Sequence, residues 1–115
     1  MQYLLLIYED EKLMAESTDA ERLDLMQRYR DYTAKLRESG AFVAGDALQS
    51  VSTAKTVRIR AGDATHTDGP FAETAEQLGG YYLIEASNLD DAIEWARQIP
   101  AAERGSVEVR PIMNY

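Results

Sequence analysis

Hydrophobic and polar positions follow three patterns along this chain, and together they predict a mixed α and β fold. Tyr3–Tyr8 is an unbroken apolar run, which in six residues favours a central strand covered on both faces, with a helix as the alternative. Thr56–Arg60 and Ser106–Arg110 alternate strictly, as strands with one apolar face do. Ala41–Leu48 and Tyr81–Ala86 also predict strands, because both are rich in apolar, β-branched or aromatic residues.

Two helices are predicted from capping residues and apolar spacing. Thr18 and Glu21 have the spacing of a capping box, so a helix is expected over Asp19–Ser39. Its apolar stripe contains Leu25, Tyr29, Tyr32 and Leu36, with Met26 and Thr33 alongside. A second helix is capped at Asn88 and ends before Pro100. Its apolar stripe contains Leu89, Ala92, Ile93 and Ala96.

A hairpin and a structured loop interrupt the middle of the chain. Ala61–Asp63 predicts a turn, and Ala64–Thr67 can return as the second arm beside the Thr56–Arg60 strand. This return would bring Asp68 back to the start of the first arm, so the following loop would lie beside two arginines. Asp68–Thr74 then combines turn-forming residues with one apolar residue, which predicts a non-helical loop.

The order of these elements predicts the fold class. It is α+β, a ferredoxin-like β-α-β-β-α-β arrangement with an antiparallel sheet, both helices on one face and an inserted β-hairpin. A single helix layer leaves the other sheet face uncovered, and large apolar patches are rare on monomers. We therefore expect a homodimer packed sheet to sheet, with the alternating strands around Val57 and Ile59 and around Val107 and Val109 at the interface.

Composition restricts the function classes. At 115 residues the chain fits a single domain, residues 1–115, and its longest apolar run is too short to span a membrane. The first residues have no basic region or cleavage site of a secretory signal, so a cytoplasmic protein is expected. A formal net charge of −8 argues against direct nucleic-acid binding. The chain has no cysteine, no phosphate-binding or dinucleotide motif and no metal-ligand spacing, so neither a cofactor nor a metal is expected.

The candidate catalytic residues are His66 and Asp68. Positions two apart on a strand share a face, so the imidazole and the carboxylate could form an oriented general base. The alternative for His66, the only histidine, is an exposed hairpin residue without a catalytic role. The alternative for Asp68 is an Asx-type turn whose carboxylate accepts hydrogen bonds from backbone amides of the loop.

The candidate ligand-binding residues suit a small polar or anionic molecule. They are Asp46, Arg58, Asp68, Phe71 and Tyr82. An arginine fork binds anions in a bidentate manner, an apolar ring can anchor a ligand, and a tyrosine hydroxyl can reach a cleft. Alternatively, the arginine forms only an ion pair on the sheet surface, and the tyrosine packs in the core or the dimer interface.

The stretch DGPFAET, followed by EQLGGYYLIEA, resembles the signature of the DGPF-type, YCII-related family. The resemblance covers nearly the whole chain and implies a dimeric α+β barrel. In the wider family a proposed dyad pairs a histidine on the first long helix with an aspartate just before a proline. This chain has no histidine there, and Ile99 precedes Pro100. The resemblance also implies an alternative function, a non-catalytic regulatory or accessory dimer module linked to sigma factors.

Overall fold

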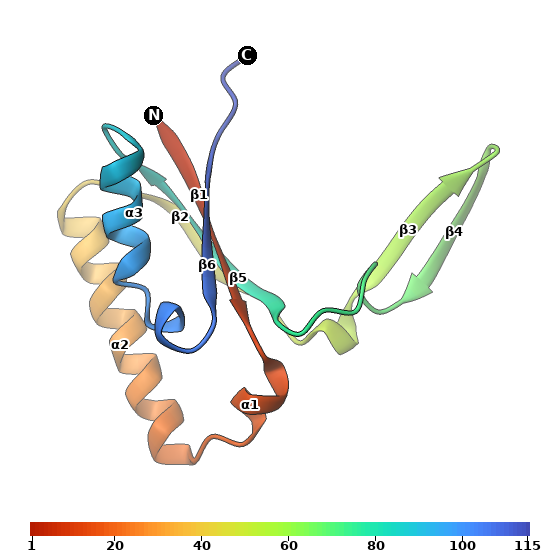
Figure 1. Ribbon diagram of the computed structural model, residues 1–115, viewed down its shortest axis with the longest axis horizontal. Helices are drawn as coiled ribbons and strands as arrows, with labels where there is room; N and C mark the ends of the chain where they lie inside the picture. Colours follow the sequence, from red (N-terminus) through yellow and green to blue (C-terminus); the bar gives the residue numbers. More distant parts are fainter.

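A four-stranded antiparallel sheet forms the centre of the computed structural model, which describes residues 1–115 (Figure 1). The strand order across the sheet is β2-β5-β1-β6, with β1 and β5 in the middle. The strands are β1 (Gln2–Glu9), β2 (Phe42–Ala47), β5 (Gln77–Glu85) and β6 (Ser106–Pro111). This order and the antiparallel pairing confirm the predicted ferredoxin-like α+β fold.

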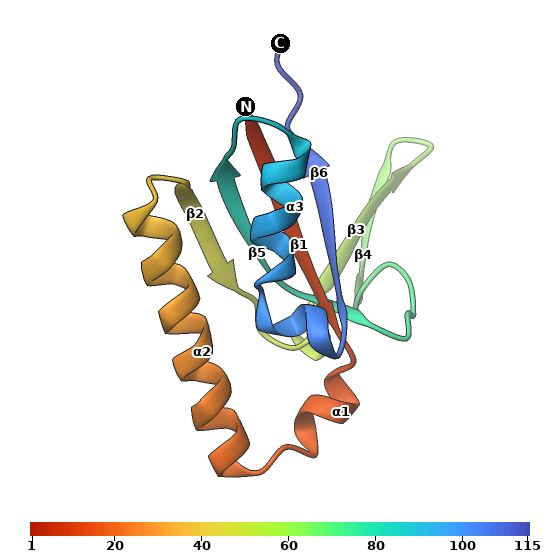
Figure 2. The same ribbon diagram turned by 60° about the vertical axis from the view of Figure 1, so that its left-hand side comes forward.

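The two long helices, α2 (Asp19–Glu38) and α3 (Leu89–Arg97), cover the same face of the sheet (Figure 2). The predicted capping box is present, because Thr18 Oγ1 accepts from the Glu21 amide while the Glu21 carboxylate accepts from the Thr18 amide, both at 3.1 Å. Three short helical segments were not predicted. These are α1 (Glu11–Ala15), η1 (Val51–Thr53) and η2 (Pro100–Glu103). None of the helices is both long enough and apolar enough to cross a membrane.

The core lies between the sheet and the two long helices. Alternate side chains of β1 are buried against α2 and α3, and those between them are only half-buried on the opposite face. The prediction that β1 is covered on both faces is therefore wrong for the single chain. Val107 and Val109 pack against the core cluster, so their predicted place on the open face is also wrong. The buried side chains include Tyr3, Leu5, Ile7, Tyr32, Leu36, Ile84, Ala92, Ala96 and Ile99.

Tyr82 connects β5 to α2 and is held by close packing. Its ring lies edge-on to Tyr32, with centroids 5.2 Å apart, and its hydroxyl oxygen is 2.7 Å from Thr33 Oγ1. A Cβ on Gly45 would lie 2.7 Å from the Tyr82 ring, so only glycine allows β2 to pass this close. The register shift of β2 lies elsewhere, between Phe42 and Ala44.

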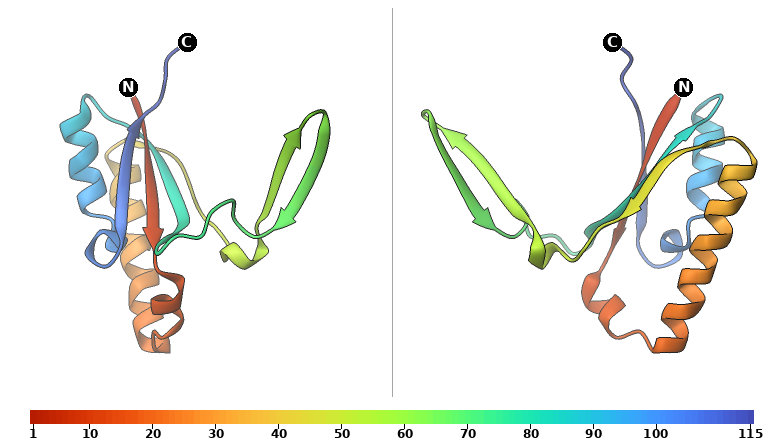
Figure 3. Two further views of the ribbon diagram at one scale, coloured as in Figure 1. Left: turned by 45° about the vertical axis from the view of Figure 1, so that its right-hand side comes forward. Right: turned by 180° about the vertical axis from the view of Figure 1, so that it is seen from behind.

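The predicted hairpin is present as a separate two-stranded sheet, β3 (Lys55–Arg60) and β4 (Asp63–Asp68), that stands away from the main sheet (Figure 1; Figure 3). Ala61 and Gly62 form the turn, with φ angles of 53° and 84°. Both are positive, as a two-residue hairpin turn requires. Lys55, and neither arginine of β3, lies opposite Asp68 in the register. The prediction that the loop after Asp68 lies beside the two arginines is therefore wrong.

Candidate functional site

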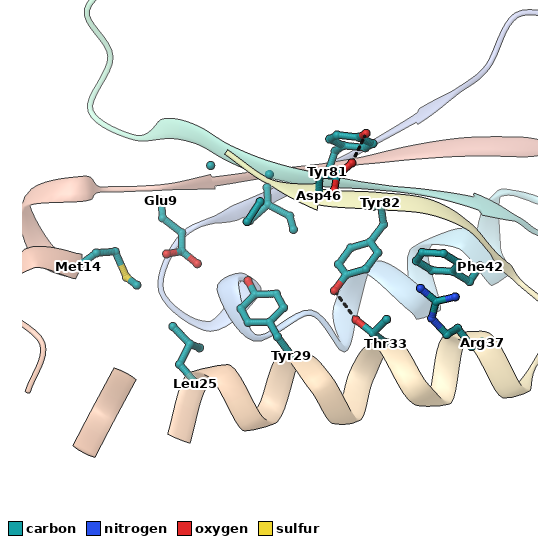
Figure 4. Close-up of a pocket in the computed structure, with 15 residues that line it drawn as sticks. Glu9, Met14, Leu25, Tyr29, Thr33, Arg37, Phe42, Asp46, Tyr81 and Tyr82 are labelled. Atoms are coloured by element: carbon teal, nitrogen blue, oxygen red, sulfur yellow. Dashed lines mark hydrogen bonds between the residues drawn. The ribbon is translucent and has the colours of Figure 1, made fainter. Parts of the chain in front are cut away.

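A cavity of about 320 Å³ lies between α2 and the helix-facing side of the sheet (Figure 4). Small-molecule sites in proteins begin at roughly this size and are typically apolar with a few polar groups. Most of the accessible wall here is apolar. The lining comes from β1, α1, α2, β2 and β5 and consists of Ile7, Glu9, Met14, Leu25, Tyr29, Thr33, Arg37, Phe42, Gly45, Asp46, Ala47, Gly79, Gly80, Tyr81 and Tyr82.

One wall of the cavity is a stripe of α2 residues spaced four apart. Leu25, Tyr29, Thr33 and Arg37 point toward the sheet in Figure 4. Residues four apart lie on one helix face, so the stripe follows directly from the sequence spacing. The buried α2 side chains, Tyr32 and Leu36, form a neighbouring stripe. The single apolar stripe expected for this helix is therefore two adjacent stripes, of which one packs the core and the other lines the cavity.

The opposite wall is hollow because β2 and β5 carry very small side chains there. Gly45, Ala47, Gly79 and Gly80 all border the cavity. A Cβ on Gly79 would meet no atom within 4 Å, whereas a Cβ on Gly45 or Gly80 would lie 2.7 or 3.0 Å from an atom of the neighbouring strand. The two glycines that follow the DGPF segment thus contribute to the cavity.

A carboxylate and a phenol share one end of the cavity. Glu9 and Tyr29 both line it, and Figure 4 shows their polar ends on the same side of the space. Burial raises the pKa of the Glu9 carboxyl above 4.5; nearby Glu76 also raises it, while Arg104 lowers it. Burial is also the main cause that raises the pKa of the Tyr29 phenol, with the charge of Glu9 as the next cause. This end of the cavity therefore places a carboxyl of raised pKa beside a phenol of raised pKa.

A cation lies at the other end. The Arg37 guanidinium carbon is 4.0 Å from the centroid of the Phe42 ring, a distance at which the ring face attracts the cation. Arg37 forms no ion pair within the chain. The Thr33 and Tyr82 hydroxyls are hydrogen-bonded to each other and lie between the Glu9 end and the Arg37 end of the cavity in Figure 4. The cavity thus has an apolar body, with an acidic side chain at one end and a basic side chain at the other.

Two of the predicted ligand-binding residues border the cavity. Tyr82 presents its ring and hydroxyl to it. Asp46 borders it from β2, but Figure 4 shows its carboxylate on the far side of the sheet, where it accepts a 3.0 Å hydrogen bond from the Tyr81 hydroxyl. This bond raises the pKa of the Tyr81 phenol.

The other predicted site residues lie outside the cavity lining. Arg58 and His66 are exposed on the hairpin, opposite Thr65 and Val57 respectively. The structure does not gather Arg58, His66, Asp68 and Phe71 with Asp46 and Tyr82 into one pocket, so their catalytic or binding roles stay predictions.

The side chain of Asp68 does not make the contacts with loop amides that its predicted structural role requires. Its side chain is 83% exposed and is paired with Lys55, and no backbone amide donates to it. The interpretation as an Asx-type turn is therefore wrong. The base of the loop is held instead by the Gly69 amide, which donates to the Ala54 carbonyl at 2.7 Å, and by Thr56 Oγ1, which donates to the Gly69 carbonyl at 2.8 Å.

Sequence reasoning missed four polar groups of the cavity. They are Glu9, Tyr29 as a polar group, Thr33 as a cavity residue and Arg37. A signal existed in the four-residue spacing that ends in Arg37 and in the acidic residue directly after the apolar run of β1. No group of three or more His, Asp or Glu side chains is arranged to hold a metal ion.

The sequence of this chain is similar to that of one known protein family. Residues 1–115 match the family model of the YCII-related domain. The chain is also 38% identical over 117 residues to an uncharacterised protein of Rhizobium meliloti (strain 1021), and the alignment covers 100% of this chain and 94% of that protein. Both matches span the whole length of this chain.

We predict that Glu9→Gln gains stability relative to wild type as the pH rises from acid to neutral. A carboxyl whose pKa is raised on folding binds its proton more tightly in the folded state. The free energy of unfolding therefore falls as the pH rises from the pKa of this carboxyl in the unfolded chain through its higher pKa in the folded protein. Glutamine cannot ionise and escapes this loss. Urea denaturation of both proteins between about pH 4 and pH 7 measures the difference.

Glu16→Gln, at an exposed position of the α1 C-terminus, is the matched control and should show no such trend. A stability difference between Glu9→Gln and wild type that stays constant over the whole pH range would contradict the burial of this carboxylate.

Proposed function

The chain belongs to the YCII-related domain family, and on that premise we propose that it binds a small molecule in the cavity between α2 and the sheet. The observation that carries the proposal is the cavity itself, an apolar space of about 320 Å³ into which a few polar groups converge. Elsewhere the helix-facing side of the sheet is packed by the core side chains.

The charges at the two ends of the cavity suggest the ligand class. An unpaired arginine favours an anionic group, for which the planar guanidinium is a strong hydrogen-bond donor. The apolar body between the ends favours a compact aromatic or aliphatic skeleton. We therefore propose a small carboxylate or similar anion with an apolar skeleton, bound with its charge toward Arg37. This keeps the anionic character expected from the sequence and moves the ligand from the DGPF loop to the cavity.

The proposed chemistry is proton transfer without a cofactor. Glu9 is the only carboxylate side chain that Figure 4 shows inside the cavity, and its raised pKa makes it a better base than an exposed carboxylate. A ligand bound by Arg37 would place its far end beside Glu9 and Tyr29, so that Glu9 could accept a proton while the phenol donates a hydrogen bond. The alternative, a non-catalytic accessory module linked to sigma factors, rests on the family resemblance alone.

We also propose that the protein acts as a homodimer through the uncovered sheet face. The cross-strand pairs Leu4–Leu83 and Leu6–Tyr81 place four large, half-buried side chains on that face. An ion pair between Glu108 and Arg110 of β6 lies at its edge. An apolar centre with a polar rim is typical of subunit interfaces.

Arg37→Met should weaken binding of a ligand in the cavity about tenfold or more, because a charge-assisted hydrogen bond contributes roughly 1.5–3 kcal/mol. The measurement is a thermal-shift screen with small aromatic and aliphatic carboxylates and their amide analogues, followed by calorimetry of the best carboxylate. Arg30→Met on the same helix is the matched control, since Arg30 does not line the cavity. His66→Ala and Asp68→Asn test the hairpin site.

The carboxylate should stabilise wild type more than its amide analogue does, and the two hairpin variants should bind as wild type. Binding that is lost in His66→Ala or Asp68→Asn but kept in Arg37→Met would place the site on the hairpin and refute the cavity.

Leu6→Asp should convert the dimer to a monomer, because it introduces a carboxylate in the middle of the proposed interface. Leu23→Asp is the matched control, since it makes the same change on the solvent face of α2, where Leu23 is 67% exposed. Light scattering gives the mass of each particle, and circular dichroism checks that each is folded. A wild-type monomer, or a folded Leu6→Asp variant that remains dimeric, would refute the interface.

A further inference from the structure

The β3–β4 hairpin contacts almost nothing else in its own chain. Every residue of its two strands is exposed except Thr56. Val57 and Ile59 are 67% and 66% exposed, and their cross-strand partners His66 and Ala64 share their face of the hairpin. A two-stranded hairpin without further packing is at best marginally stable in water. The apolar face of this hairpin therefore lacks the packing partner that its length requires.

The base of the hairpin is nevertheless fixed to the rest of the molecule. The Glu11 carboxylate accepts from Ser50 Oγ at 2.7 Å and from the Val51 amide at 3.1 Å, which ties α1 to η1 just before β3. The Glu11 amide donates to Gln77 Oε1 at 2.9 Å, which ties the same point to the start of β5. Both ends of the inserted segment are thus held at one place, so the hairpin projects in a defined direction.

That direction is toward the uncovered face of the sheet. In Figure 1 and Figure 3, α2 and α3 lie on one side of the main sheet, and the hairpin stands on the other side, beyond the uncovered face. A second sheet packed on that face would lie about 10 Å away. The hairpin of one subunit would then extend alongside the second subunit.

The surface area of the chain supports a second copy as the partner. The chain exposes 8066 Å², whereas a compact monomer of its mass, 12.9 kDa, exposes about 6,300 Å². Its radius of gyration is 16.1 Å, against about 13 Å for a compact chain of this length. The excess of roughly 1,800 Å² per chain matches the area that each subunit buries in a large homodimer interface.

Charge supports the same partner. The hairpin, residues 55–68, has three cationic and two anionic side chains and a net charge of +1, so the rest of the chain carries −9 of the total of −8. Arg58 and Arg60 lie on the face opposite Val57 and form no ion pair. A cationic arm on an acidic protein is attracted to a second copy of that protein.

We propose that the β3–β4 hairpin is an intersubunit arm, whose apolar face around Val57 and Ile59 packs on the second subunit of the homodimer. The inference rests on the proposed homodimer and adds to it a second contact region beside the sheet face. His66 lies on the packing face, so the arm buries it at the interface. The arginines of the opposite face remain toward solvent and contribute long-range attraction.

Two aspartate variants on opposite faces of the same hairpin test the arm. Val57→Asp places a carboxylate on the packing face, and Thr65→Asp makes the same charge change on the other face, opposite Arg58. Sedimentation velocity over a dilution series gives the dimer dissociation constant. Val57→Asp should raise the constant about tenfold or more, and Thr65→Asp by less than about threefold.

A dimer with equal dissociation constants in both variants would refute the arm and leave the sheet-face dimer and the cavity intact. A wild-type monomer would refute the homodimer and the arm together, while ligand binding in the cavity remains separately measurable.

A cross-link provides a second readout that does not depend on the stability of a variant. The chain has no cysteine, so Ile59→Cys carries a single benzophenone label. The labelled protein is mixed with unlabelled, ¹⁵N-enriched wild type, and mass spectrometry identifies the peptides joined after illumination. If the hairpin is an intersubunit arm, the ¹⁴N hairpin peptide should be cross-linked to ¹⁵N peptides of the second subunit. Cross-links from the hairpin only to ¹⁴N peptides, in a mixture that forms dimers, would refute the arm.

Discussion

A single layer of helices on a four-stranded sheet is the constraint on which the rest of this structure depends. α2 and α3 bury alternate residues of β1 and β5 on one face, and the same alternation leaves Leu4, Leu6 and Leu83 half-buried on the other. A sheet with two apolar faces and one cover is stable only if something packs on the second face, since burial of apolar surface is the main favourable contribution to folding. The proposed dimer and the proposed arm are both consequences of this requirement.

The covered face has its own consequence, which is the cavity. The core stripe of α2 packs tightly through Tyr32 and Leu36, but the adjacent stripe faces glycines and an alanine of β2 and β5 and cannot fill the space. The Tyr82 hydroxyl and Thr33 Oγ1, 2.7 Å apart, connect the sheet to the helix beside this space. These small residues leave the space for the proposed ligand, while the core beside them provides the stability. The lining of the proposed site and the core packing are separated by one residue position along the helix.

Signals between neighbouring residues predicted the main helices and strands. They could not predict which residues meet in space, because that depends on long-range arrangement. The capping box at Thr18 and the position of the hairpin turn depend on neighbouring residues, so they could be predicted from the sequence, whereas the positive φ angle of Ala61 was not predicted. The position of Arg58 relative to Asp68 depends on hairpin register, and a return that pairs Asp68 with Lys55 takes both arginines away from the loop. The position of Glu9 directly after the apolar run of β1 was a weak signal, because the burial that makes it a site residue comes from elements distant in the sequence.

A second copy of the chain, packed on the uncovered sheet face and on the hairpin, would cover the apolar surface that one chain leaves exposed, and hydrogen exchange can detect that packing directly. Amides of an unpacked hairpin exchange quickly, because the free energy of local opening is close to zero. Mass spectrometry can follow exchange in peptides covering residues 56–67 at protein concentrations above and below the dimer dissociation constant. Packing of the hairpin on a second subunit predicts slow exchange in the dimer that becomes fast on dilution. Equally fast exchange in a fully formed dimer and in the monomer would contradict it.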